Sequence, residues 1–175
     1  MIRSAILVGM GAVMAAVAGE TLVYTAFGAF PRPPEHVLDE AANPRVSGVL
    51  PDGWQDDSSW APVWIMYSFE DEQGTRFLRT KVTRLDSGRA QLTCFPLADC
   101  PGDRLYRLAF RARHLTGGSV TFGLRQRGQP YAFYWQRTEK LSANWGTYSY
   151  EFAAGKNDQP MGFWFNLEAT GVFDL

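Results

Sequence analysis

The sequence predicts an all-β fold, a two-sheet antiparallel β-sandwich preceded by a single N-terminal transmembrane helix. Apolar and polar residues alternate with period two through most of the chain after Asn43, and turn-forming residues recur at intervals of about ten residues. No long amphipathic helical pattern interrupts this alternation. Residues 1–30 differ from the rest, because Arg3 and Glu20 are their only charged residues.

The composition bounds the class of protein. The chain has 175 residues, of which 46% are hydrophobic and 14% aromatic, enough for one globular body with a full core. Its 17 basic and 18 acidic residues give a net charge of -1. Because no global field then attracts a polyanion, we expect no nucleic-acid partner.

Strand patterns fill the body of the chain. They cover residues 63–70, 76–84, 89–95, 105–113, 120–126, 131–137, 147–153, 161–167 and 172–175. In the fourth of them, alternation places Leu108 and Phe110 in the core and Arg107, Arg111 and Arg113 on the opposite face. We interpret this arginine row as a solvated outer face, with a lipid-headgroup contact or a docking surface for an acidic partner as alternatives.

The N-terminal segment is long enough to span a bilayer. No residue from Ser4 to Gly19 is charged, and the apolar character resumes after Glu20 and continues to Phe30. With Arg3 alone before it, the segment is expected to lie in the inner (cytoplasmic) membrane, with the N-terminus cytoplasmic and the sandwich periplasmic or otherwise extracytoplasmic. A cleaved signal peptide ending near Ala18 is the alternative. The retained anchor is favoured, because residues 19–30 would make an unusually apolar mature N-terminus.

Small residues follow one face of the predicted helix. Gly11, Ala15 and Gly19 recur at every fourth position, a spacing that lets another helix approach closely. Glu20 is costly inside a span and is expected to face a partner, a cavity or the headgroups. The segment is therefore predicted to pack against other membrane helices.

A proline-rich spacer over residues 31–42 follows the anchor. Pro31, Pro33 and Pro34 exclude a helix or a central strand at its start, and residues 35–42 could form one short helical turn. The sandwich is expected over residues 43–175.

The two cysteines, Cys94 and Cys100, are predicted to form a disulfide across a short loop that contains Pro96. The alternative is that both are small buried apolar residues. Their spacing, with only His36 and His114 to complete a ligand set, predicts no metal site.

The sequence offers no chemistry that would make an enzyme. It contains no nucleophile elbow, metalloprotease helix, phosphate-binding loop or dinucleotide fingerprint. Its densest carboxylates lie in apparent turns, where acids serve solvation and capping. A two-carboxylate glycosidase site would need a deep cleft that a sandwich of this size rarely offers.

Outward-facing aromatic residues are the candidate binding site. Alternation turns Trp64, Tyr134, Trp164 and Asn166 away from the core, and Trp60 lies in a loop. Such rings form either a platform on which sugars stack or a protein-binding hot spot. The alternative is that sandwich edges and loop packing absorb them.

The order of turn and core motifs over residues 43–175 resembles the jelly-roll carbohydrate-binding modules that accompany cellulases and xylanases, and their galactose-binding-like relatives. The motifs are Asn43-Pro44, Pro51-Asp52-Gly53-Trp54, Gly88-Arg89-Ala90-Gln91-Leu92, Tyr106-Arg107-Leu108-Ala109-Phe110-Arg111-Ala112-Arg113, Leu141-Ser142-Ala143-Asn144-Trp145-Gly146-Thr147-Tyr148-Ser149-Tyr150-Glu151-Phe152 and Gly171-Val172-Phe173-Asp174. The resemblance implies two antiparallel sheets, a concave face that holds a sugar chain against aromatic side chains, and often a structural calcium ion.

The chain departs from that pattern in two respects. We expect no catalytic domain beside the module, and the last strand stops at Asp174 and Leu175 without a dense cluster of oxygen ligands. We therefore expect no cofactor, with the structural calcium as the alternative that the resemblance implies.

Two functions follow from these patterns. The first is a non-catalytic accessory subunit whose anchor and sandwich dock on a larger membrane protein complex of a photosynthetic, respiratory or secretion type. The alternative is a cell-surface protein that binds polysaccharide in the groove of a carbohydrate-binding module.

Overall fold

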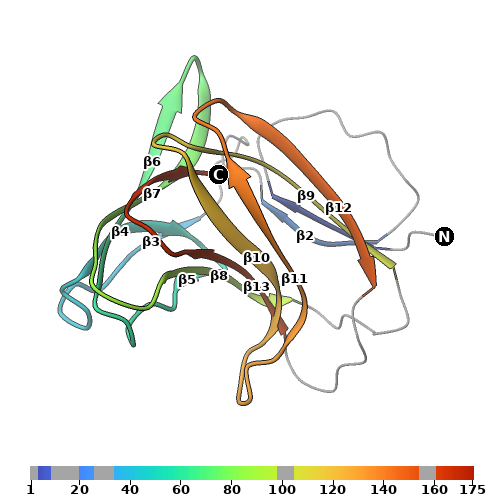
Figure 1. Cartoon of the computed structure of the whole chain (residues 1–175), viewed down its shortest axis with the longest axis horizontal. Coiled ribbons are helices and arrows are strands. Elements are labelled where there is room, and N and C mark those ends of the chain that lie inside the picture. Colours follow the sequence, from blue (N-terminus) through green and yellow to red (C-terminus); the bar gives the residue numbers. More distant parts are fainter. Residues whose placement is uncertain (1–3, 9–19, 26–33, 98–104, 154–160) are drawn as a thin grey trace.

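The computed structural model describes residues 4–8, 20–25, 34–97, 105–153 and 161–175, and within them the chain is all-β (Figure 1). Two sheets form a sandwich. One sheet has nine strands in the order β2-β1-β9-β14-β7-β6-β4-β3, with β12 also paired to β9, and the other has five in the order β11-β10-β13-β8-β5. The strands of the larger sheet are β1 (Ser4–Val8), β2 (Glu20–Thr25), β3 (Glu35–Val37), β4 (Val46–Pro51), β6 (Val63–Glu72), β7 (Thr75–Leu85), β9 (Leu105–His114), β12 (Gly146–Ala153) and β14 (Gly171–Asp174). Those of the smaller sheet are β5 (Trp54–Asp56), β8 (Ala90–Leu97), β10 (Gly118–Gln126), β11 (Phe133–Leu141) and β13 (Met161–Leu167).

Sheet membership alternates along the chain, as a jelly roll requires. The chain crosses from β7 to β8, returns with β9, and alternates again through β12, β13 and β14. Most neighbouring strands are antiparallel, whereas β4 pairs with β6, and β1 with β2 and β9, in parallel. In Figure 1 the β6–β7 hairpin extends past the rest of its sheet.

Both sheets contribute to one core, which is rich in aromatic rings. Phe110 of β9 lies 4.9 Å from Phe122 of β10 and 5.3 Å from Phe165 of β13, measured between ring centroids. Trp135 of β11 stacks on Phe152 of β12 at 4.1 Å. These contacts join strands of opposite sheets, so burial of these rings holds the two layers together.

The predicted strand pattern is confirmed. Each of the nine predicted strands has a counterpart, and Leu108 and Phe110 are buried as alternation indicates. Three short strands, β3, β4 and β5, were not predicted. Within residues 35–42, where one helical turn was expected, Glu35–Val37 pairs with β4 and a turn follows, in which the backbone N–H groups of Ala42 and Asn43 donate to the backbone oxygen of Asp39 at 3.1 and 3.2 Å.

The N-terminal transmembrane helix expected over residues 1–30 is not confirmed by the residues of this segment that the structure describes. Ser4–Val8 and Glu20–Thr25 are described as strands, so Glu20 begins β2. The predicted helix contacts Gly11, Ala15 and Gly19 lie outside the described residues.

Among the residues that the structure describes, no helix is long and apolar enough to cross a membrane.

The predicted Cys94–Cys100 disulfide is not supported. Cys94 is a free thiol buried in the core, and Cys100 lies outside the described residues. Burial raises the pKa of the Cys94 thiol to about 12, so this thiol is protonated and unreactive near neutral pH.

Candidate functional site

A groove lies on the face of the five-stranded sheet that points away from the core. It encloses about 610 Å³. Its lining residues come from β5, β8, β10, β11, β13 and the adjoining loops: Gln55, Asp57, Trp60, Arg89, Gln91, Arg125, Arg127, Tyr131, Phe133 and Trp164. The groove thus combines aromatic rings with polar and charged groups, a composition typical of ligand sites.

Strand register places Trp164 on the groove floor. It lies on the central strand β13, where its backbone neighbours are Gly123 of β10 and Thr93 of β8. Phe163 and Phe165, its neighbours in sequence, point into the core. Sequence alternation therefore gave the correct face for Trp164, but the side chain is only 1% exposed, because other residues of the groove cover it.

Trp60 is the exposed aromatic ring of the groove, and a hydrogen-bond chain fixes its orientation. The side chain is 56% exposed, and its indole Nε1 donates to Gln91 Oε1 at 2.8 Å. Gln91 is buried and in turn donates from Nε2 to Asn166 Oδ1 at 2.9 Å. A large exposed ring that is held by buried polar groups is arranged for contact with a ligand rather than for packing.

The loop that carries Trp60 is anchored to the opposite sheet. Asp56, at the end of β5, accepts hydrogen bonds from Tyr67 of β6 and from the backbone and side chain of Ser58, at 2.8 to 3.0 Å. Ser58 Oγ also accepts from the backbone N–H of Gln91 at 2.7 Å. Burial raises the pKa of Asp56, while these three hydrogen bonds lower it. Burial, with Asp56 nearby, raises the pKa of Tyr67 well above its usual value, so Tyr67 stays a donor.

Arg125 of β10 lies across the aromatic side chains of the groove. Its guanidinium carbon is 4.4 Å from the ring centroid of Trp164, 4.8 Å from Tyr131 and 5.6 Å from Phe133. Its Nε donates to the backbone oxygen of Tyr131 at 3.1 Å. Burial lowers the pKa of Arg125, Asp57 raises it and Arg89 lowers it, but an arginine remains charged at neutral pH.

A bulge in β11 turns the side chain of Tyr134 toward the core, not away from it as predicted. Leu124 pairs with Trp135, yet Arg125, the next residue of β10, pairs with Phe133. Tyr134 is the extra residue, and it packs against the core, whereas Phe133 lies in the groove. Period-two alternation had predicted the reverse, with Tyr134 facing outward and Phe133 in the core. A bulge reverses the alternation, and it leaves no clear mark in the sequence.

The remaining predicted binding residues are separated. Trp64 lies on β6 of the nine-stranded sheet, where the Arg84 guanidinium sits 4.3 Å from its ring centroid. Asn166 faces away from the core as predicted, but it is fully buried and supports Gln91. The structure therefore brings Trp60 and Trp164 together and leaves Trp64 on the other sheet. The binding role of each residue stays a prediction.

Several groove residues were not predicted. Arg125 and Gln91 have a signal in the sequence, because the residues beside them, Leu124 and Leu92, are core positions of alternating strands. Asp57 lies in a loop whose path no periodicity predicts, and Tyr131, which alternation placed at the start of a strand over residues 131–137, lies in the loop before β11. Tyr131 adopts a φ of 59°, which is unusual for a residue with a side chain.

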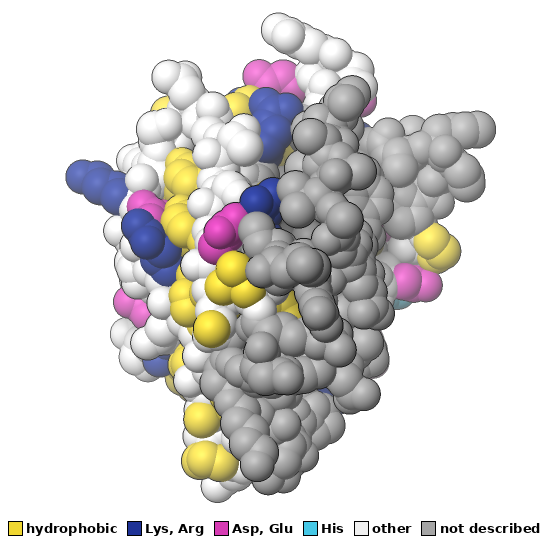
Figure 2. Space-filling view, turned by 90° about the vertical axis from the view of Figure 1, so that its right-hand side faces the viewer, with side chains coloured by type: hydrophobic (Ala, Val, Ile, Leu, Met, Phe, Trp, Pro, Cys, Tyr) yellow, Lys and Arg dark blue, Asp and Glu magenta, His cyan; other side chains and the backbone are white. Residues whose placement is uncertain are grey.

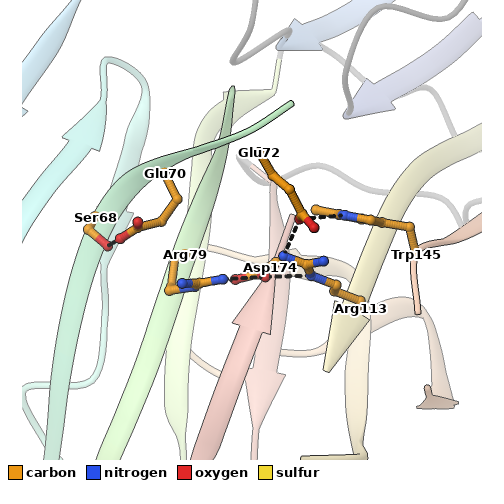
Figure 3. Close-up of polar contacts among 7 residues, drawn as sticks. All are labelled: Ser68, Glu70, Glu72, Arg79, Arg113, Trp145 and Asp174. Atoms are coloured by element: carbon orange, nitrogen blue, oxygen red, sulfur yellow. Dashed lines mark hydrogen bonds and ion pairs between the residues drawn. The ribbon is translucent and has the colours of Figure 1, made fainter. Parts of the chain in front are cut away.

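Two residues of the predicted arginine row form ion pairs on the nine-stranded sheet, whereas the guanidinium carbon of the third, Arg111, lies 5.4 Å from the ring centroid of Trp145. Arg107 pairs with Glu151 of β12 at 2.7 Å, and Arg113 pairs with Glu72 and with Asp174, each at 2.7 Å. Figure 3 shows Asp174 between Arg79 and Arg113, and Glu72 between Arg113 and Trp145. On the face that Figure 2 shows, acidic and basic side chains are intermingled. This pattern fits a structural and solvated face.

The donor set does not fit the structural calcium that the resemblance implies. Asp174, the carboxylate of the last strand, accepts hydrogen bonds from Arg79 and Arg113, and two cations beside it disfavour a third. Within residues 34–97, 105–153 and 161–175, no group of three or more His, Cys, Asp or Glu side chains is placed to hold a metal ion.

Comparison with known proteins gives no match in sequence and clear matches in structure. No protein-family profile matches the chain, and no curated protein matches it. A solved family 4 carbohydrate-binding module is similar over 85% of this chain and 93% of its own, with a TM-score of 0.59 and 19% identity.

Two further structures have the same fold. One is a family 11 carbohydrate-binding module from Clostridium thermocellum in complex with a β-1,3-1,4-mixed-linked tetrasaccharide, with a TM-score of 0.53 and 10% identity over 81% of this chain and 92% of that one. The other is an arabinose-bound α-L-arabinofuranosidase, with a TM-score of 0.54 and 16% identity over 70% of this chain and 22% of that one. The chain therefore has the jelly-roll fold of carbohydrate-binding modules, as the motif order indicated.

Proposed function

We propose that this protein is a non-catalytic module that binds a polysaccharide chain in the groove of its five-stranded sheet. The observation that carries the proposal is Trp60, which is 56% exposed at the groove and is held by Gln91. Pyranose rings present an apolar face of C–H groups, which packs on a flat aromatic ring, while their hydroxyls need amide and charged partners. Gln55 supplies an amide to the same groove.

The shape of the site supports an extended ligand. The groove spans all five strands of the sheet, from Gln55 on β5 to Phe133 on β11. Fold likeness alone does not establish a ligand, so the proposal depends on the groove residues of this chain.

Affinity gel electrophoresis and calorimetry on a panel of soluble neutral and acidic polysaccharides test the proposal. We expect Trp60→Ala to weaken binding by about tenfold or more, which corresponds to the loss of roughly 1.4 kcal/mol of contact energy. Trp64→Ala is the matched control, because it removes the same side chain from the other sheet, and it should bind like the unchanged protein. Equal affinity for the two variants would contradict the assignment of the groove.

A second candidate function is the accessory subunit of a membrane protein complex, with an inner-membrane anchor and a periplasmic sandwich. The observation that favours it is the uncharged segment from Ser4 to Gly19. Extraction in mild detergent, followed by mass spectrometry of co-purifying proteins, tests it. Replacing Gly11, Ala15 and Gly19 by leucine should reduce co-purification if a helix packs through that strip.

A further inference from the structure

The groove has a charge that the chain as a whole lacks. Among the described residues that line it are three arginines, Arg89, Arg125 and Arg127, and a single carboxylate, Asp57, whereas the net charge of the chain is -1. Neutral sugars need no such excess, because amides and aromatic rings bind them. Arginines gathered in a recessed site raise the local concentration of anions.

Arg125 is held in place before any ligand arrives. The rings of Trp164, Tyr131 and Phe133 surround its guanidinium, and Nε is used by the backbone oxygen of Tyr131. The Nη groups form no ion pair within 4 Å with any carboxylate of the described residues. A fixed planar guanidinium whose remaining donors are not engaged in an ion pair matches the two oxygens of a carboxylate.

The neighbouring acids only partly offset this positive charge. Arg89 contacts Glu168 at 3.5 Å, but both side chains are exposed by more than a third, so water screens the pair. Burial raises the pKa of Asp57, and Arg125 and Arg127 lower it in turn, so Asp57 supplies one negative charge against the arginines at neutral pH.

We propose that the groove selects an acidic glycan, a polysaccharide whose sugar residues carry carboxylates, with a sugar ring on Trp60 and a carboxylate on Arg125. This inference rests on the proposed function and deepens it by naming the class of ligand. An anion in the groove would add a counter-charge to Arg125 beyond that of Asp57, and the aromatic rings around Arg125 would exclude water and strengthen the contact.

The test compares two ligands that differ only in charge. β-1,4-Glucan oligosaccharides and the same chains oxidised to carboxylate at C6 are titrated into the full-length protein by calorimetry. We expect the oxidised chains to bind at least tenfold more tightly at low ionic strength and to lose most of that advantage at 1 M salt, where the screening length falls to ~3 Å. Arg125→Gln should abolish the preference, and Arg125→Lys, which keeps the charge without the fork, should retain part of it. Lys81→Gln removes one exposed positive charge from β7 and should leave the preference unchanged.

The outcomes separate this inference from the proposed function. Equal binding of neutral and oxidised chains, both weakened by Trp60→Ala, would overturn the acidic-glycan inference and leave the polysaccharide function standing. Absence of binding to every chain would overturn both. Tighter binding of sulfated glucan, or of polyglutamate, than of the oxidised chain would overturn the assignment to carboxylated glycans, in favour of a sulfate ester or of an acidic protein segment.

Discussion

Asp174 is a carboxylate that two arginines share. Its carboxylate is fully buried, and it accepts hydrogen bonds from Arg79 at 2.7 and 2.8 Å and from Arg113 at 2.7 Å (Figure 3). Hydrogen bonding to Asp174 raises the pKa of Arg79 despite partial burial. Burial lowers the pKa of Arg113, but hydrogen bonds to Asp174 and Glu72 raise it, and the pKa of Arg113 is raised overall. The last strand is thus tied to β7 and β9 through one side chain.

Replacing Asp174 by asparagine should therefore be costly. The variant leaves two partly buried guanidinium groups without their shared carboxylate, and we expect the free energy of unfolding to fall by on the order of 3 kcal/mol. Urea denaturation of the variant measures this loss. Glu151→Gln, which breaks the more exposed pair with Arg107, should cost no more than about 1 kcal/mol. Losses of similar size in both variants would contradict the account of Asp174.

His114 should make stability depend on pH. The side chain is 3% exposed, and burial lowers its pKa below 6.5, although Asp174 opposes this effect. The unfolded chain then takes up a proton at a higher pH than the folded protein, so the contribution of His114 is complete above pH 6.5 and is lost as pH falls through the folded pKa. Thermal melting between about pH 7 and pH 5 measures this loss.

A variant of His114 tests whether the protonation of this residue causes the pH dependence of stability. His114→Gln cannot titrate, so its melting temperature should vary less over the same pH range. A pH dependence that persists in His114→Gln would show that another group is responsible.

Individual site residues were predictable only where alternation holds. Trp164 was assigned to the correct face because β13 has no irregularity at that point, whereas Tyr134 was misassigned at the bulge. Alternation places Arg125 on an outward face, as it does Trp164. Arg125 was not predicted as a binding residue, because an arginine on an outward face of a strand is usually solvated. Only the structure shows that aromatic rings from two other elements surround it.

At the scale of elements, the pairing of β10 with β11 shapes one side of the groove. Gly123 lies between Trp164 and Gln136 in the register, next to the bulge. A Cβ atom at Gly123 would approach the backbone oxygen of Trp135 to 2.1 Å. The two strands can keep this spacing only while that position has no side chain.

We expect Gly123→Ala to separate β11 from β10 locally. Its melting temperature should fall by several degrees, and amide exchange should accelerate at residues 133–137 before it does elsewhere in the sheet. Gly128→Ala is the control, because a Cβ at that loop position meets no atom within 4 Å. Equal exchange rates in β11 of both variants would be inconsistent with this role for Gly123.

The long strands were predictable, whereas of the short ones only β14 was, for a physical reason. Strands of seven or more residues, such as β9 and β13, repeat the alternation often enough to be recognised. β4 contains Gly48 and ends at Pro51, which usually indicate a loop. Gly48 has a φ of 107°, and a Cβ there would come within 1.8 Å of the Tyr67 backbone oxygen, so this glycine permits the parallel pairing with β6. The need for glycine at position 48 thus arises from β6, a strand distant in the sequence, and the residues of β4 alone do not reveal it.

At the scale of the whole molecule, one shared core should make the two sheets unfold together. The single ring of Phe110, for example, contacts rings of β10, β12 and β13. Urea transitions followed by tryptophan fluorescence and by far-ultraviolet circular dichroism are therefore expected to coincide. Phe110→Ala should shift both transitions by the same amount, at a cost of about 3 to 5 kcal/mol. Transitions at different urea concentrations would indicate sheets that unfold separately.

The sandwich itself was the most predictable feature. Alternation and turn spacing indicated a β-sandwich, because both depend only on residues near one another in sequence, and the motif order over residues 43–175 resembled that of jelly-roll modules. The N-terminal prediction depended on hydropathy alone, and apolar residues such as those of Ser4–Val8 suit a strand as well as a helix. The disulfide prediction depended on spacing and on an expected oxidising compartment, and neither shows whether Cys94 is buried in the core.

The position of β11 at the edge of the five-stranded sheet has a consequence for self-association. An edge strand presents unpaired backbone groups, to which a second molecule could add a strand. The exposed stretch of β11 carries Arg137, Glu139 and Lys140, and a strand from another copy would have to strip water from these charges. Concentrated solutions of the protein should therefore resist fibril formation through this edge, and a variant with Arg137, Glu139 and Lys140 replaced by valine, threonine and valine should assemble readily.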